Sequence, residues 1–165
     1  MILRAVTLAV GLTGAFGAAQ FPAYSQQYMQ RLGGAVDALA QVVADFDASA
    51  AKEGLSRAEA LAQMRGTAFV ERRRADMIRT FDRHERLRDD LVVLQGQGPF
   101  MRAYHATHLT DAEIAKRAWQ AFQPAFPLTL ATGLFAFAGF VTSTFLLGLM
   151  LALLRWPLRR RSLPA

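Results

Sequence analysis

The three histidines come closest, of all residues in this chain, to a pattern that could do chemistry. His105 and His108 lie three residues apart in an irregular stretch before a helix, and with His84 or Asp111 they could bind zinc or another divalent cation. The spacing alone carries little weight, because loop histidines are more often solvated or cap a helix. We therefore predict no metal and no cofactor, and regard His84, His105 and His108 as the residues to inspect.

A run of three arginines, Arg72-Arg73-Arg74, could bind an anion. It interrupts an apolar stripe between Val70 and Met77, so one of the three must face inward or the helix must lie at an edge. An anion or lipid-headgroup site is one interpretation. We favour the other, a solvated arginine run whose aliphatic stems cover apolar surface.

Two pairs of carboxylates, Asp45 with Asp47 and Asp89 with Asp90, could serve in acid–base catalysis. They lie on polar helix faces without a base, nucleophile or glycine loop nearby, so we interpret them as solvated charges. The chain has no cysteine, which excludes disulfides and thiolate chemistry. No Walker loop, GxSxG, HExxH or dinucleotide fingerprint is present either. We predict a protein that is not an enzyme and has no catalytic residue.

The elements that would position these residues begin with an apolar C-terminal segment. Arg117 and Arg155 bracket 37 residues without a charge, and Leu128 to Leu154 supplies 27 of them. A helix needs about 20 apolar residues to cross a bilayer. Trp156 and three arginines follow, as expected at a membrane interface. We predict a transmembrane helix over residues 124–156 and a basic tail over 157–165.

The N-terminal segment is a second, less apolar span. Residues 5–19 are uncharged, and with Ile2, Leu3 and Phe21 they are just long enough to cross a bilayer. A cleaved signal peptide is the rival, since Arg4 and the small residues 17–19 fit one. We favour a retained helix over residues 1–22, because Phe21 and Tyr24 suit an interface and lead directly into a helical pattern.

The placement of charge predicts the orientation. Five arginines flank the outer ends of the two apolar spans, whereas residues 20–125 hold 14 basic and 13 acidic residues. Under the positive-inside rule, both termini are cytoplasmic and residues 23–123 form a domain on the opposite side of the membrane, which is the periplasmic side if the protein is bacterial. The net charge of +6 is thus mostly a topology signal, and we predict no nucleic-acid partner.

The first exported segment has one apolar face of helical period. Leu39 lies at its centre, so we expect Leu39 to be fully buried, and Gly54 to cap the helix C-terminus. Gly33-Gly34 predicts close packing or a bend within it. The face consists of Tyr28, Leu32, Ala35, Leu39, Val42 and Phe46.

Two further helix starts follow. Ser56 to Glu59 is a capping box, and the helix it opens is expected to break near Gly66-Thr67 and resume with a charged face. On that face we expect the ion pairs Asp82–Arg86 and Arg86–Asp90. The apolar face of the resumed helix consists of Met77, Phe81, Leu87, Leu91 and Leu94, with His84 in the gap.

The last start is Thr110 to Glu113, a second capping box, with Leu109 and Ile114 placed as a hydrophobic staple. The helix reaches Pro124 and passes through Pro127 into the membrane, and we interpret it as lying on the bilayer surface.

Small residues recur at intervals of four in both apolar spans. They allow close backbone approach, either between the two spans of one chain or between chains. The motifs are Gly11-x-x-x-Ala15, Gly14-x-x-x-Ala18 and Gly139-x-x-x-Ser143.

Several strings resemble a family of small proteobacterial inner-membrane proteins of unknown function. The most specific is Phe21-Pro22-Ala23-Tyr24-Ser25-Gln26-Gln27-Tyr28, and Gly54-Leu55-Ser56-Arg57-Ala58-Glu59 and Leu154-Arg155-Trp156-Pro157 extend the resemblance over nearly the whole chain. The resemblance implies a bacterial inner-membrane location and no known activity or site residue.

Together these observations predict an all-α membrane protein in which two transmembrane helices flank an exported antiparallel helical bundle. We expect a non-enzymatic interaction or scaffold role, with the bilayer and either a second copy or another envelope protein as partners and no small-molecule substrate evident. The alternative is a periplasmic ligand-sensing or transport accessory subunit that works through a separate partner.

Overall fold

The structure, a computed structural model, describes residues 1–124 and 129–160, and every regular element in them is a helix. The prediction of an all-helical chain is confirmed. The elements are α1 (Ile2–Ala19), α2 (Phe21–Lys52), α3 (Arg57–Gln63), α4 (Ala68–Leu94), α5 (Pro99–Tyr104), the 3-10 helix η1 (Ala106–His108), α6 (Ala112–Gln120) and α7 (Leu130–Arg160).

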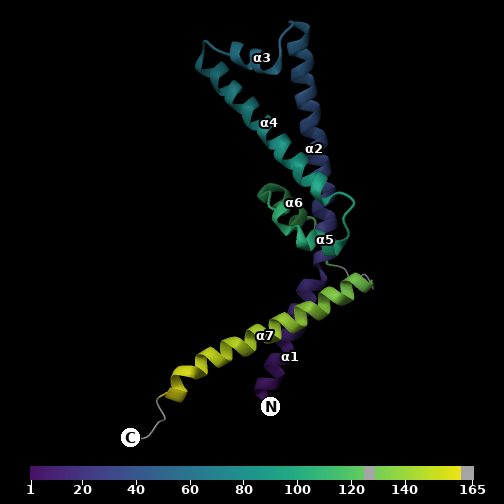
Figure 1. Ribbon diagram of the computed structural model, residues 1–165, viewed down its shortest axis with the longest axis vertical. Helices are drawn as coiled ribbons and strands as arrows, with labels where there is room; N and C mark the ends of the chain where they lie inside the picture. The colour runs from purple at the N-terminus through teal and green to yellow at the C-terminus, as the bar shows by residue number, and fades with distance from the viewer. Residues whose placement is uncertain (125–128, 161–165) are drawn as a thin grey trace. The chain divides into compact units, whose positions relative to one another are not determined.

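The chain divides into two compact units, each with its own packing (Figure 1). The terminal unit combines Met1–Ser25 with Phe122–Ala165, so it contains α1, the first turn of α2, and α7. The central unit is Gln26–Ala121 and contains the remaining helices. The predicted exported segment, residues 23–123, encloses the central unit.

Within the terminal unit, α1 and α7 cross at glycines. A Cβ atom on Gly14 would lie 2.5 Å from the Cβ of Ser143 and 2.8 Å from the carbonyl oxygen of Gly139. A Cβ on Gly139 would lie 2.5 Å from the Cβ of Ala18 and would also collide with the Gly14 carbonyl group. Only glycine allows the two backbones to approach so closely. The small-residue motifs therefore pack the two spans of one chain against each other.

Two helical stretches are long and apolar enough to cross a membrane. They lie in Ile2–Lys52 and Leu130–Leu154, with mean hydropathies of 1.6 and 2.1 over their most apolar windows. Only 11% of the first window and none of the second is buried by the protein itself. Core helices of soluble proteins that are as long and apolar are mostly buried, whereas these two are mostly exposed, as expected of helices that cross a membrane.

The backbone runs from α1 into α2 with a single residue between them. Gln20 has φ −79° and ψ −17°, which is α-helical, and its carbonyl oxygen accepts a hydrogen bond of 3.0 Å from the Tyr24 amide. The apolar span near the N-terminus therefore leads directly into the first helix of the central unit.

In the central unit, α2 and α4 are two arms that diverge (Figure 1). The helix α3 bridges their far ends, and α5 and α6 lie beside the other end of the pair. The buried core is concentrated near α5 and α6, where α2, α4 and α6 contribute side chains. Its buried members include Tyr28, Leu32, Val36, Leu87, Leu94, Ile114 and Ala118.

Leu39 is not fully buried, so that prediction is wrong. Its side chain is half-buried, because Leu39 lines two open clefts that it shares with Arg83 of α4. The predicted close packing at Gly33-Gly34 is also wrong, since a Cβ on either glycine would meet nothing within 4 Å and α2 continues through both.

The turns between α2, α3 and α4 follow the sequence closely. Gly54 has φ +68°, as a helix C-terminal glycine requires, and Ser56 and Glu59 exchange both hydrogen bonds of the predicted capping box. The break before α4 occurs at Gly66, with φ +113°, and the hydroxyl of Thr67 then caps α4 by accepting from the Val70 amide. Both helix-start predictions and the predicted break are confirmed.

The start of α6 differs from its prediction. Asp111, rather than Thr110, is the N-cap, and its carboxylate accepts a 2.9 Å hydrogen bond from the Ile114 amide. This shift of one residue removes Leu109 and Ile114 from the staple positions. Ile114 and Ala118 are buried in the protein, whereas Trp119 of the same helix is 69% exposed; the position of α6 on a bilayer surface stays a prediction. The predicted passage through Pro127 lies outside the described residues.

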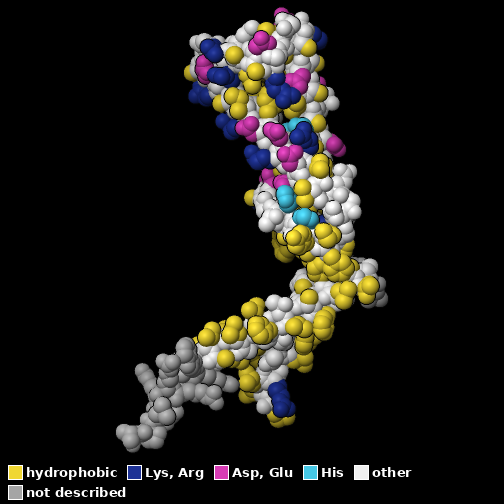
Figure 2. Space-filling view, in the orientation of Figure 1, with side chains coloured by type: hydrophobic (Ala, Val, Ile, Leu, Met, Phe, Trp, Pro, Cys, Tyr) yellow, Lys and Arg dark blue, Asp and Glu magenta, His cyan; other side chains and the backbone are white. Residues whose placement is uncertain are grey.

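The exposed face of α4 is covered with charged side chains, as Figure 2 shows. The predicted pairs Asp82–Arg86 and Arg86–Asp90 are not formed in the described chain, where Asp90 instead accepts from a histidine of η1. The observed pairs on α4 are Arg73–Asp76, Arg74–Glu71, Arg79–Asp76 and Arg88–Asp89.

Candidate functional site

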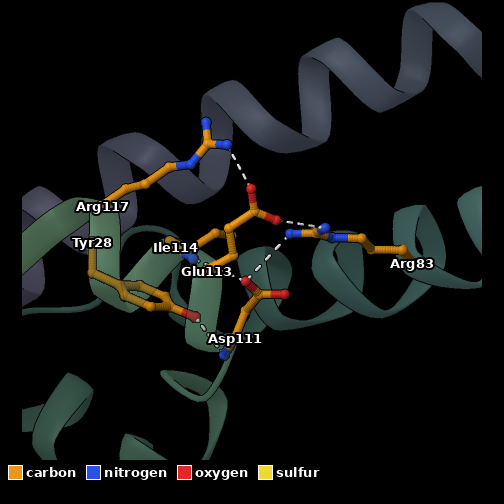
Figure 3. A network of polar contacts seen from close by, with 6 residues as sticks. All are labelled: Tyr28, Arg83, Asp111, Glu113, Ile114 and Arg117. Carbon is orange, nitrogen blue, oxygen red and sulfur yellow. Dashed lines mark hydrogen bonds and ion pairs between the residues drawn. The ribbon is translucent and has the colours of Figure 1, made fainter.

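Arg83 of α4 joins its helix to the start of α6. One guanidinium nitrogen lies 2.8 Å from a carboxylate oxygen of Glu113, and another lies 3.4 Å from Asp111 (Figure 3). The second oxygen of Glu113 lies 2.5 Å from the guanidinium of Arg117, one turn further along α6. Glu113 is therefore held between two arginines that come from different helices.

Tyr28 connects the same junction to α2. Its side chain is completely buried, and its hydroxyl oxygen accepts a 3.1 Å hydrogen bond from the backbone amide of Asp111 (Figure 3). Because Asp111 also caps α6, one residue receives contacts from α2 and α4 while it starts α6. The side chain of Gln27 adds a second link to α6, donating to the Ala121 carbonyl at 3.3 Å.

The two arginines lower the pKa of Glu113. The largest cause is the hydrogen bond from Arg83, followed by the positive charges of Arg83 and Arg117. The carboxyl group is therefore ionised at neutral pH and is a poor proton donor. The arrangement suits charge-assisted binding better than acid–base catalysis.

An open cleft of about 410 Å³ lies beside this junction, and we call it the arginine cleft. Three arginines, Arg31, Arg83 and Arg117, contribute to its lining together with Glu113. The rest of the lining is apolar or small, and consists of Gly34, Ala35, Ala38, Leu39 and Ile114.

Arg31 is the distinctive residue of the cleft. Its side chain forms no ion pair among the described residues, and its Nε–H group is buried without a hydrogen-bond acceptor. Buried donors of this kind are rare in proteins and call for an explanation.

A second cleft, of about 540 Å³, opens between the arms and shares Leu39 and Arg83 with the first. Its lining is mostly charged and comes from α4. Besides the two shared residues it consists of Asp76, Arg79, Thr80, Asp82 and Arg86.

The histidines do not assemble a metal site in the described residues, where no group of three or more His, Asp or Glu could hold an ion. The rings of His105 and His108 lie 6.2 Å apart, between centroids. His108 instead forms a 2.6 Å hydrogen bond through Nδ1 with Asp90, which ties η1 to α4. His84 is half-buried on α4, and Asp111 is engaged with Arg83.

The other charged candidates have local roles. Arg74 is the inward-facing member of its run, half-buried with a buried Nε, while Arg72 and Arg73 are exposed. Asp45 accepts a 2.8 Å hydrogen bond from Gln41, and Asp89 pairs with its neighbour Arg88.

Asp47 is not a simple solvated charge. Its carboxylate pairs with Arg57 of α3 at 2.5 Å, and the guanidinium lies 4.7 Å from the ring centre of Phe81 on α4. The hydrogen bond from Arg57 lowers the pKa of Asp47. Phe81 also packs edge-on against Phe46 of α2 at 5.2 Å, so this cluster connects α2, the start of α3 and the middle of α4.

Sequence reasoning did not predict the arginine cleft. Its residues come from three helices, and Arg83 and Asp111 are 28 positions apart, so no local spacing connects them. The local signal was the capping box from Thr110 to Glu113, which places Asp111 and Glu113 at a helix start but does not connect them with Arg83 or Arg31.

Comparison of the chain with known proteins identifies its family. No curated protein and no solved structure matches the chain. The family model described as protein of unknown function (DUF2937) matches residues 2–160, and the chain therefore belongs to the DUF2937 family.

Proposed function

We propose that this protein is a non-enzymatic interaction module anchored in a bacterial inner membrane. In this proposal α1 and the apolar part of α7 span the membrane, both termini are cytoplasmic, and the central unit is periplasmic. The exposed apolar surfaces of the two helices support the spanning role. The orientation rests on Arg4 and the C-terminal arginines, which lie at the outer ends of the spans.

The observation that carries the interaction role is the incomplete cover of the apolar face of α2. Near α5 and α6 this face is buried, with Val36 only 7% exposed. Further along the same helix Phe46 packs against Phe81 of α4, but Val42 between them and the core is 42% exposed. A continuous apolar face that the chain covers only in part is typical of a surface that meets another protein.

The exposed apolar residues of α4 do not extend the argument to the second arm. Phe69 and Val92 are each 68% exposed, and Ile78 is 38% exposed. Single exposed residues of this kind are common on soluble proteins. Phe69 and Ile78 lie about 180° apart around α4, so they form no common face and the interaction role rests on α2 alone.

Site-specific photo-crosslinking in native membranes tests this function. A photoreactive residue at Val42 is expected to give a protein adduct, either with a second copy or with another envelope protein. Ala44 is the matched control, since it is also exposed but lies about 200° around the same helix. Equal crosslinking from the two positions, or none from either, would refute the proposal.

The second candidate is a ligand-sensing or transport accessory subunit that works through a separate partner. The arginine cleft favours it, because its volume lies within the range of small-molecule sites, about 300 to 1,000 Å³. Identification of the Val42 adduct separates the candidates, since a transporter or a signalling protein in the adduct would support the second.

A further inference from the structure

We propose that the arginine cleft is a binding site for a monoanionic amphiphile, a carboxylate or phosphate headgroup on a short hydrocarbon chain. This inference goes beyond the interaction role, because it concerns a small ligand and a different surface of the central unit. The headgroup would come either from a free organic acid or from an anionic lipid.

The charges around the cleft leave one positive charge unmatched. Arg83 and Arg117 share the carboxylate of Glu113, and Arg83 also faces Asp111. Arg31 has no ion pair among the described residues, so three guanidinium groups face two carboxylates. A single negative charge on a ligand would complete the balance.

Arg31 also supplies the donor. Its side chain lines the cleft without an ion pair among the described residues, and its terminal guanidinium nitrogens, unlike the buried Nε, are open to a ligand there. A carboxylate or phosphate oxygen is the acceptor that an arginine binds best, because its planar donors match the geometry of these anions.

The rest of the cleft lining is small or apolar, which is why we propose that the ligand carries a hydrocarbon chain. Gly34, Ala35 and Ala38 present little side chain to the cleft, and this leaves space against α2. Leu39 and Ile114 complete an apolar wall that offers no hydrogen bond to a polar ligand. The glycine pair of α2 also acquires a role here, since Gly34 opens the cleft whereas Gly33 does not line it.

Binding of hexanoate to the full chain in lipid nanodiscs tests the proposal. In discs of zwitterionic lipid we expect saturable binding of hexanoate at one site per chain. Hexanol should show no saturable binding, because its partitioning into the discs is the same with and without the protein. Arg31→Gln should weaken hexanoate binding about tenfold to a hundredfold, the range of one charge-assisted hydrogen bond. Arg72→Gln removes the same charge from an exposed position outside the cleft and should change binding less than about twofold.

A second pair of variants tests the space independently of the charge. Gly34→Leu should weaken binding about tenfold by filling the cleft, whereas Gly33→Leu should leave it unchanged. Both changes favour the helix, and a Cβ at either position meets no neighbour within 4 Å, so both proteins are expected to fold. The two glycine variants therefore test the proposed site even if Arg31→Gln fails to fold.

Repeating the titration in discs of anionic phospholipid, at an ionic strength that screens the surface charge, identifies the source. Weaker hexanoate binding there would show that a lipid headgroup competes for the cleft, and unchanged binding would indicate a free organic acid; both support the site. Equal binding of hexanoate and hexanol would overturn the proposal. So would equal affinities of the wild-type, Arg31→Gln and Gly34→Leu proteins.

Discussion

Replacing Leu32 with alanine should destabilise the central unit more than the same replacement at Leu39, seven residues further along α2. Both changes remove three carbon atoms, worth about 2.4 kcal/mol if fully buried, at about 0.8 kcal/mol each. Leu32 is completely buried, so truncation also leaves a cavity and the total should reach about 3 to 5 kcal/mol.

Leu39 lines two open clefts, so its truncation enlarges space that water already reaches. No sealed cavity forms, and part of the side chain is exposed before the change. The expected loss is therefore about 1 to 2 kcal/mol. The central unit should have a total stability of about 5 to 15 kcal/mol, so the Leu32 variant loses a large fraction of it.

Thermal unfolding of the full chain in mild detergent, followed by circular dichroism, measures the difference. The apolar helices are expected to stay helical in detergent, so the loss of signal reports the central unit. Leu32→Ala should lower Tm by about 10 °C or more, and Leu39→Ala by less than half as much. Equal effects at the two positions would refute the inference that α2 is more tightly packed at Leu32 than at Leu39.

Three further predictions follow from particular contacts. The arginines lower the pKa of Glu113, so the contact stabilises the fold fully above the ordinary glutamate pKa of about 4.3. This stabilisation is lost as the pH falls through the lowered pKa. Between pH 6 and pH 3, the Tm measured by circular dichroism should therefore fall more for the wild type than for Glu113→Gln. Equal losses would show that the contact contributes nothing. Gly139→Leu should push α1 and α7 apart and lower the temperature of aggregation in detergent, whereas Gly148→Leu, with no neighbour within 4 Å, should not. Protein equilibrated with Zn²⁺ and then desalted should retain no stoichiometric metal, because His108 is bonded to Asp90; retention that is abolished by His105→Ala and His108→Ala would restore the metal site.

Features that depend on neighbouring residues were predicted correctly, whereas features that depend on contacts between distant segments were not. The capping box at Ser56, the glycine at Gly54 and the break at Gly66 depend on residues within one helical turn, and they were predictable for that reason. The start of α6 was misplaced by one residue because Thr110 and Asp111 are both good caps. Only the contacts of Asp111 with Tyr28 and Arg83 favour the second.

The sequence by itself determined the helical class, the two apolar spans and most helix ends, because hydrophobic period, glycine conformation and capping act over a few neighbouring residues. It also placed small residues on the faces where α1 and α7 cross, without deciding which helices would meet. The tertiary structure alone decided that these faces pair within one chain, that Leu39 lines open clefts and is not buried in the core, and that Arg31, Arg83 and Arg117 surround one cleft. Those features depend on how α2, α4 and α6 meet in space, and residues that far apart in sequence leave no periodic or local signal of their contact.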